Sequence, residues 1–183
     1  MMEKKLDELL CKKYPKLFRD RNAPMTETCM CWGFSHGDGW FNIISNLCAN
    51  IQHHIDGEAK QRKQALAYNK MLAQAKTGNW KLFDTYYKGW KPNDPFVLAR
   101  RADVQTDTPR EVPEKPHQVV VTQVKEKFGT LRFYYNGGDD YIRGLVSMAE
   151  AMSATTCEEC GSAGILRPGG WVHTACDAHA ERK

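Results

Sequence analysis

The chain has 183 residues, a formal net charge of +4 and a hydrophobic content of 42%. This length suits one domain with a small appendage, and we expect no membrane-spanning helix because no apolar run is long enough. Lys4 and Lys5 are not followed by the apolar core of a signal peptide. Seven cysteines are an odd number and fit a disulfide framework poorly, so the sequence predicts a reducing, cytoplasmic setting.

The first 55 residues predict two helices separated by a loop. Residues 2–13 carry leucines on one stripe, and residues 20–39 have the glycines and proline of a loop. Asp38 is a candidate N-cap for a helix over residues 40–55. Apolar residues on that helix follow the spacing of a buried face: Trp40, Ile44, Leu47, Ile51 and Ile55.

The composition changes in residues 56–103, where ten Lys and Arg stand against five Asp and Glu. A helical segment over residues 58–76 has Gly78 as its C-terminal stop, and a short helix follows at about 80–88. The longer segment has one apolar stripe: Tyr68, Met71, Leu72 and Ala75. Residues 104–117 hold three prolines and many charges, which is typical of an exposed linker. We therefore expect residues 56–117 to form a basic helical insertion and linker.

A β-hairpin over residues 118–135 is the clearest strand signal. Period-two alternation puts Arg132 and Tyr134 on the face opposite the apolar residues of the returning strand. Asp139 or Asp140 is expected to cap a helix that runs to about Ser153. The predicted fold class is α+β, with several helices around a β-hairpin. Its core consists of residues 1–55 and 118–154, and a zinc-binding module occupies residues 155–183.

Two pairs of potential metal ligands dominate the last 27 residues: Cys157 and Cys160, then Cys176 and His179. Fifteen residues separate the pairs, which is within the range of zinc sites. Four protein ligands describe a closed, structural Zn²⁺ site, in the layout of a treble-clef or zinc-ribbon module. A redox-active disulfide between the first two cysteines is the rival interpretation.

The fourth ligand has a competitor, because His173 lies only three residues before Cys176. Cys176 and His179 would share one face of a first helical turn, which favours His179. The module is slightly acidic, with three Lys and Arg against four Asp and Glu, whereas a finger that grips phosphates carries a basic face. Cys29, Cys31 and Cys48, with His36, His53 and His54, are a second candidate ligand set, and buried cysteines with surface histidines are the simpler interpretation.

The hairpin carries the candidate ligand-binding residues Lys125, Lys127, Arg132 and Tyr134. These side chains could bind a phosphate or another anion, and Gly129 would let a ligand approach backbone amides. A solvated face, balanced by neighbouring carboxylates, is the alternative. Asp139 and Asp140 could bind Mg²⁺, although their position before a helix favours caps. The basic insertion, with aromatic residues near its cations, could instead bind single-stranded nucleic acid.

Four stretches of the chain together resemble a widespread group of small, uncharacterised bacteriophage and prophage proteins: KYPKLF (13–18), PMTETCMCWGFSHGDGWFNIISNLC (24–48), VKEKFGTLRFYYNGGDDYIRGLVSMAE (124–150), and CEECG with GGWVHTACDAHA in the terminal module. The resemblance implies a setting and no reaction. It suggests a small accessory protein, and such proteins frequently act as regulators or as antagonists of host defence.

These patterns favour a binding protein over an enzyme, with an anionic, nucleotide-like signal or a host protein as its partner. No HExxH, P-loop, GxSxG or dinucleotide-binding pattern is present in the sequence. Nucleic-acid binding by the insertion is a second hypothesis. An enzyme with an unrecognised site around Arg132, Asp139 and Asp140 is a third.

Overall fold

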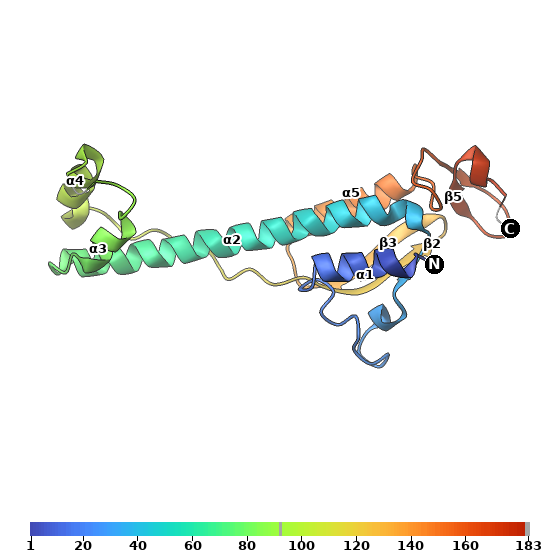
Figure 1. Cartoon of the computed structure of the whole chain (residues 1–183), viewed down its shortest axis with the longest axis horizontal. Coiled ribbons are helices and arrows are strands. Elements are labelled where there is room, and N and C mark those ends of the chain that lie inside the picture. The colour runs from blue at the N-terminus through green and yellow to red at the C-terminus, as the bar shows by residue number, and fades with distance from the viewer. Residues whose placement is uncertain (92, 182–183) are drawn as a thin grey trace. The chain divides into compact units, whose positions relative to one another are not determined.

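The computed structural model describes residues 1–91 and 93–181 and has an α+β fold (Figure 1). The chain divides into two compact units, residues 1–55 with 117–183, and residues 56–116. The helices are α1 (Lys4–Lys13), α2 (Phe41–Lys76), α3 (Lys81–Tyr86), α4 (Pro95–Ala102) and α5 (Asp140–Ser153). The strands are β1 (Phe34–Ser35), β2 (Val120–Lys127), β3 (Thr130–Asn136), β4 (Ile165–Arg167) and β5 (His173–Ala175).

The two helices expected over residues 40–55 and 58–76 are one continuous helix, α2. Gly57 lies inside it, and a single glycine costs a helix only about 1 kcal/mol relative to alanine. Asp38 does not cap α2, because a 3-10 turn (Asp38–Trp40) precedes the helix and the Asp38 carboxylate accepts a hydrogen bond from the Glu3 N–H at 2.6 Å. The expected apolar face is buried, with Trp40, Ile44 and Ile51 fully inaccessible.

Three strands form the sheet of the first unit, in the order β1-β2-β3. β1 pairs with β2 in parallel, and β2 pairs with β3 as the expected antiparallel hairpin. Phe34, Val124 and Phe133 lie at paired positions on the buried face. They join the side chains of α2 and α5 in one hydrophobic core.

Helix α5 lies beside β3, at the edge of the sheet. The Leu131 N–H donates to Ser153 Oγ at 2.8 Å, and the Phe133 N–H donates to the Glu150 carboxylate at 3.0 Å. At the other edge, the carbonyl of Phe34 accepts from the Met2 N–H at 3.3 Å. Asp139 caps α5 by accepting from the Ile142 N–H at 3.0 Å, as predicted. Backbone groups at both edges of the sheet therefore have partners from within the chain.

The turn between β2 and β3 consists of Phe128 and Gly129, because Lys127 and Thr130 are the last paired residues. Both turn residues have positive φ, 56° for Phe128 and 83° for Gly129. A two-residue hairpin loop of this type normally carries Asn-Gly. A residue with a bulky side chain pays about 1–2 kcal/mol for the left-handed region, and Phe128 is 72% exposed, so burial does not offset that cost.

The second unit has its own small core. Tyr68, Met71, Leu72 and Ala75 of α2 are buried there, as their spacing predicts. They pack with Phe83 of α3, Val97 of α4 and Val104. Helix α4 and a buried residue inside the expected linker were not predicted, because short helices and single buried side chains leave little periodic signal in a sequence.

Candidate metal centre and the surfaces around it

The four predicted metal ligands lie together at the end of the chain. The ligand atoms of Cys157, Cys160, Cys176 and His179 are all within 4.8 Å of one another. Cys157 and Cys160 follow α5, whereas Cys176 and His179 lie at the 3-10 turn (Asp177–His179) that follows β5. The order of knuckle, β4–β5 hairpin and helical turn is the one expected from the sequence, and the arrangement is compatible with a metal site.

The distances between pairs of donor atoms show how closely the four residues approach one another. The sulfurs of Cys160 and Cys176 are 3.8 Å apart. Nδ1 of His179 lies 3.6 Å from the Cys157 sulfur and 3.2 Å from the Cys176 sulfur. His179 therefore faces the cluster with its Nδ1 atom.

His173 is not part of this cluster. Its ring is buried on β5, and its Nδ1–H donates to the Trp171 carbonyl at 3.1 Å. Its Nε2 atom has no hydrogen-bond partner among the described residues, yet it lies outside the group of four donors. Of the two candidates left open by the sequence, the structure places His179 with the cysteines.

The cysteines of the cluster differ in their affinity for protons. Hydrogen bonds from the side chain and backbone of Ser162 lower the pKa of Cys160 to about 6. Desolvation and the neighbouring Cys160 and Cys157 raise the pKa of Cys176. The Cys160 thiolate is thus readily formed, whereas the Cys176 thiol resists taking negative charge unless a cation lies beside it.

The knuckle is held against the core by the segment that precedes α2. The Gly39 N–H donates to the Glu158 carbonyl at 2.7 Å, and the Gly37 N–H donates to the buried Glu158 carboxylate at 3.0 Å. The Trp40 indole N–H donates to the Thr156 carbonyl at 2.9 Å. A Cβ atom at Gly39 would lie 2.1 Å from the Cys157 carbonyl oxygen, so only glycine permits this approach.

The β2–β3 turn makes a second contact with the terminal module. The Thr174 hydroxyl donates to the Gly129 carbonyl at 2.6 Å, and a Cβ atom at Gly129 would lie 2.4 Å from Leu166 Cδ1. The Gly129 N–H already donates to the Glu126 carboxylate at 2.6 Å. The expectation that Gly129 opens backbone amides to a ligand is therefore wrong, because this glycine serves the packing of β4 and β5.

The predicted ligand-binding side chains share the other face of the hairpin. Lys125 pairs with Arg132 across the strands, and Lys127 pairs with Thr130. The Lys125 ammonium lies 5.4 Å from the centre of the Tyr134 ring. Arg132 donates to Thr130 Oγ1 and to the Leu131 carbonyl, both at 2.7 Å. Within the described part of the chain, neither lysine is within 4.0 Å of a carboxylate oxygen.

The remaining candidate ligands lie apart from the four-donor cluster, and His54 Nε2 lies 2.7 Å from a carboxylate oxygen of Asp139. Among the described residues, Cys29, Cys31, Cys48, His36 and His53 belong to no group of three or more potential metal ligands. Cys48 and His36 are buried. Burial lowers the pKa of His36 to about 4, which keeps its ring neutral at physiological pH.

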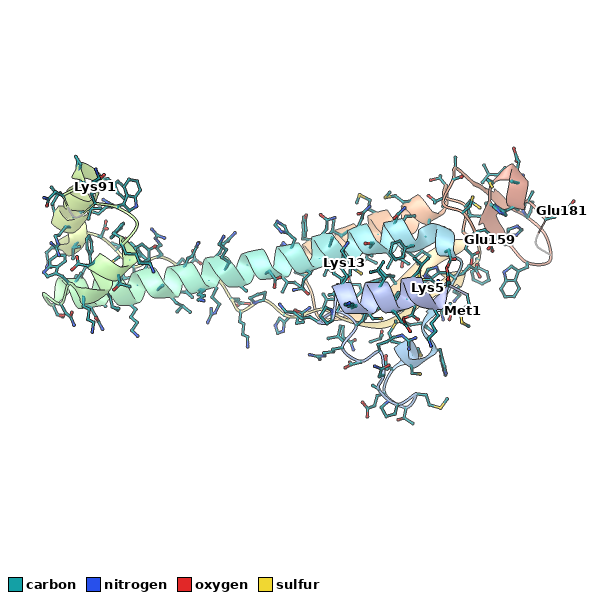
Figure 2. The ribbon with its side chains drawn as sticks, viewed as in Figure 1. Met1, Lys5, Lys13, Lys91, Glu159 and Glu181 are labelled. Atoms are coloured by element: carbon teal, nitrogen blue, oxygen red, sulfur yellow. The ribbon has the colours of Figure 1, made fainter. Side chains whose placement is uncertain are left out.

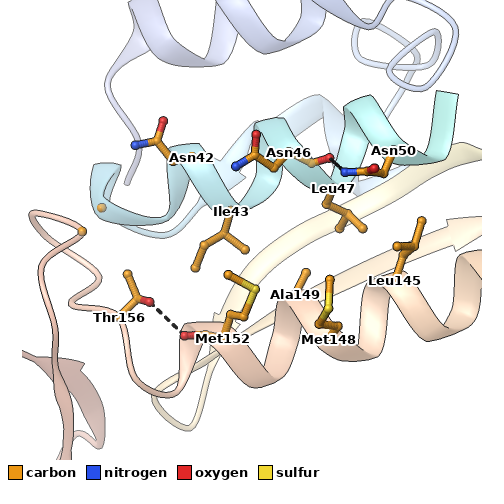
Figure 3. Close-up of a pocket in the computed structure, with 12 residues that line it drawn as sticks. Asn42, Ile43, Asn46, Leu47, Asn50, Leu145, Met148, Ala149, Met152 and Thr156 are labelled. Carbon is orange, nitrogen blue, oxygen red and sulfur yellow. Dashed lines mark hydrogen bonds between the residues drawn. The ribbon is translucent and has the colours of Figure 1, made fainter. Parts of the chain in front are cut away.

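A cavity of about 230 Å³ lies between α2 and α5 (Figure 3). Asn42, Asn46 and Asn50 line it at one-turn intervals along α2, and Met148 and Met152 line it from α5. The lining contains no charged side chain. The cavity therefore cannot supply the positive charge that an anionic ligand requires.

The second unit has a more polar hollow of about 520 Å³ between α3 and α4. Lys88, Lys91 (Figure 2) and Arg101 line it together with Trp90 and Asp84, and the Asp84 carboxylate lies 3.1 Å from Arg101. The Trp90 ring is 53% exposed and lies 4.9 Å from the Phe96 ring, centre to centre.

No protein-family profile, curated protein or solved structure matches this chain. None of the helices in residues 1–91 and 93–181 has the length and apolar character needed to span a membrane.

The Gly39 contact yields a stability prediction. Gly39→Ala should lower the free energy of unfolding by about 1–3 kcal/mol, because the added Cβ forces the knuckle away from the segment before α2. Urea denaturation measures the change. Gly57→Ala is the matched control, since a Cβ there has no neighbour within 4 Å and should stabilise α2 by up to about 1 kcal/mol. Equal effects at the two positions would contradict the packing argument.

Proposed function

We propose that the terminal cluster binds Zn²⁺ as a structural ion. Tetrahedral zinc has bonds of about 2.3 Å to sulfur and about 2.0–2.1 Å to nitrogen. These lengths give tetrahedron edges of about 3.8 Å between sulfurs and about 3.6 Å between sulfur and nitrogen. The Cys160–Cys176 and Cys157–His179 separations, 3.8 and 3.6 Å, match those edges, whereas the Cys176–His179 separation of 3.2 Å is shorter than the sulfur–nitrogen edge. Four protein donors fill the coordination shell and leave no position for a substrate.

We further propose that the protein acts by binding an anionic, nucleotide-like ligand on the solvent face of the β2–β3 hairpin. The observation that carries this proposal is the register, which puts Lys125 opposite Arg132 and leaves Lys127 on the same face. Lys125 and Lys127 have no ion-pair partner among the described residues, so their charge is available to a phosphate. Arg132 is tied to the hairpin backbone and lies 3.9 Å from the Glu150 carboxylate, so its charge is held in a fixed position and is partly compensated.

In this proposal the protein is a phage or prophage accessory protein that works in the host cytoplasm. The resemblance to small phage proteins supplies the setting, and the need for reduced thiols at the metal site fits that compartment. A protein that sequesters a nucleotide-like signal would antagonise a host defence that depends on that signal. A host protein with an acidic surface is the alternative partner for the same cationic face.

Nucleic-acid binding by the second unit is a second candidate function. It is favoured by the exposed Trp90 ring beside Lys88, Lys91 and Arg101, since bases stack on aromatic rings while cations contact phosphates. Residues 56–103 also carry an excess of positive charge, with ten Lys and Arg against five Asp and Glu.

The metal assignment predicts one zinc ion per chain in native mass spectrometry of protein purified without added metal. Cys176→Ser should abolish zinc retention and expose residues 155–181 to proteolysis, because structural zinc contributes on the order of 10 kcal/mol in small modules. Cys29→Ser is the control and should keep its zinc. Two zinc ions in the parent protein, or one that survives Cys176→Ser, would contradict the assignment.

The anion site predicts that pyrophosphate binds and is detected by isothermal titration calorimetry. Replacing Lys125 and Lys127 together by Ala should weaken binding about tenfold or more, since each tenfold loss corresponds to about 1.4 kcal/mol. The Lys4→Ala and Lys5→Ala pair removes the same charge from exposed positions on α1 and should leave the affinity unchanged. Equal losses of pyrophosphate affinity in the two double variants would show that the effect depends on net charge alone. Absence of pyrophosphate binding by the parent protein would refute the site.

The second candidate predicts that a single-stranded oligonucleotide binds with an affinity that falls steeply with salt. Trp90→Ala should weaken this binding about 5- to 150-fold, the range expected for one stacked base. Trp32→Ala, which removes another exposed ring, should have no effect. Binding that is insensitive to salt and to Trp90 would exclude the second unit as the nucleic-acid site.

A further inference from the structure

We infer that the groove at the tip of the β2–β3 hairpin holds the base of a nucleotide, stacked on Phe128 and Trp171, with its phosphates on Lys125 and Lys127. This inference rests on the proposed anion site and names the ligand class for it. Neither aromatic ring figures among the ligand-binding residues that the sequence suggests.

The groove lies between two loops far apart in the sequence. Its lining comes from the β2–β3 turn and from the loop between β4 and β5: Glu126, Lys127, Phe128, Gly170, Trp171 and Val172. Its volume of about 440 Å³ is in the range of small-molecule sites, roughly 300–1,000 Å³. Phe128 is 72% exposed and Trp171 is 66% exposed, so large apolar surfaces of both rings face solvent beside the groove.

The backbone of Phe128 is the second observation. Its φ of 56° lies in the left-handed region, at a turn position that asparagine or glycine fills without strain. Because the ring is exposed, packing in the core does not offset the cost of this backbone conformation. A strained residue that presents an exposed ring to a groove is better explained by a ligand than by the stability of the turn.

The charges around the groove orient the ligand. The Lys127 ammonium lies 5.4 Å from the centre of the Phe128 ring, on the side of the hairpin that also carries Lys125. Glu126 lines the groove itself and accepts the Gly129 N–H at 2.6 Å. Its negative charge repels phosphate and suits an amino group on a base. We therefore place the base in the groove and the phosphates on the face of the hairpin that carries Lys125 and Lys127.

Nucleotide chemistry of this kind is offered both by free nucleotides and by single-stranded nucleic acid. ADP, a short oligoadenylate and pyrophosphate are the probes, titrated by calorimetry into the full chain. ADP should bind about 5- to 150-fold more tightly than pyrophosphate, which is the gain expected from one stacked base. A gain for the oligoadenylate alone would identify single-stranded nucleic acid as the source of the ligand.

Phe128→Asn is the decisive variant, because it removes the ring and relieves the turn. It should raise the urea midpoint, cancel the gain of the base-bearing probes and leave pyrophosphate binding unchanged. Trp171→Ala should cancel the same gain, whereas Phe128→Trp and the control Trp32→Ala should preserve it. A rise in the urea midpoint excludes misfolding as the cause of lost binding.

The outcomes separate this inference from the proposed function. If pyrophosphate binds but neither ADP nor the oligoadenylate loses affinity on Phe128→Asn, the groove is not a base site and the anion site stands. If pyrophosphate, ADP and the oligoadenylate all fail to bind, the inference and the proposed function fall together.

Discussion

The contact between the cysteine knuckle and the segment before α2 is the constraint on which the first unit depends. Gly39 brings two backbones so close that its N–H reaches the Glu158 carbonyl at 2.7 Å and no side-chain atom fits between them. The same segment leads directly into α2, whose first turns fill the hydrophobic core. A metal ion bound by Cys157 and its neighbours would therefore stabilise the start of the longest helix as well as the end of the chain.

The terminal module and the β2–β3 hairpin contribute different features to the proposed sites. The terminal module brings four potential metal ligands together, and its sequence is slightly acidic. The hairpin supplies Lys125 and Lys127, which have no ion-pair partner among the described residues, and an exposed ring at its turn. β5 links the two, since the Thr174 hydroxyl holds the Gly129 carbonyl at 2.6 Å. The exposed ring of Phe128 is thus presented on a turn that the terminal module fixes in place.

Strong local periodicity made much of the fold predictable from the sequence. The buried stripe of α2, the hairpin, the Asp139 cap and the cysteine and histidine cluster each have a short-range signal in residue spacing. Long-range features lacked such a signal. The continuity of α2 through Gly57 and the pairing of β1 with β2 depend on contacts made by residues distant in sequence.

The same distinction applies to the candidate sites. The cluster of four potential metal ligands was predictable because the spacing within each pair is local. The choice of His179 over His173 depends on the fold, which places Nδ1 of His179 beside the sulfurs of Cys157 and Cys176. The packing role of Gly129 could not be predicted from the sequence, because its contacts Leu166 and Thr174 come from a later part of the chain. Trp171 and Phe128 likewise line one groove although they are far apart in the sequence, so residue spacing does not predict that they lie together.

The hydrogen bonds from β3 to α5 also bear on how this protein behaves in a crowded cell. An open strand edge is a template on which another chain can add a strand, and this pairing is a common first step of aggregation. Ser153 and Glu150 occupy the Leu131 and Phe133 N–H groups with side-chain oxygens, and β1 at the opposite edge is only two residues long. Fewer backbone N–H groups on the edge of β3 are therefore left for an added strand. A helix that the hydrophobic core already requires thus also protects this edge of the sheet.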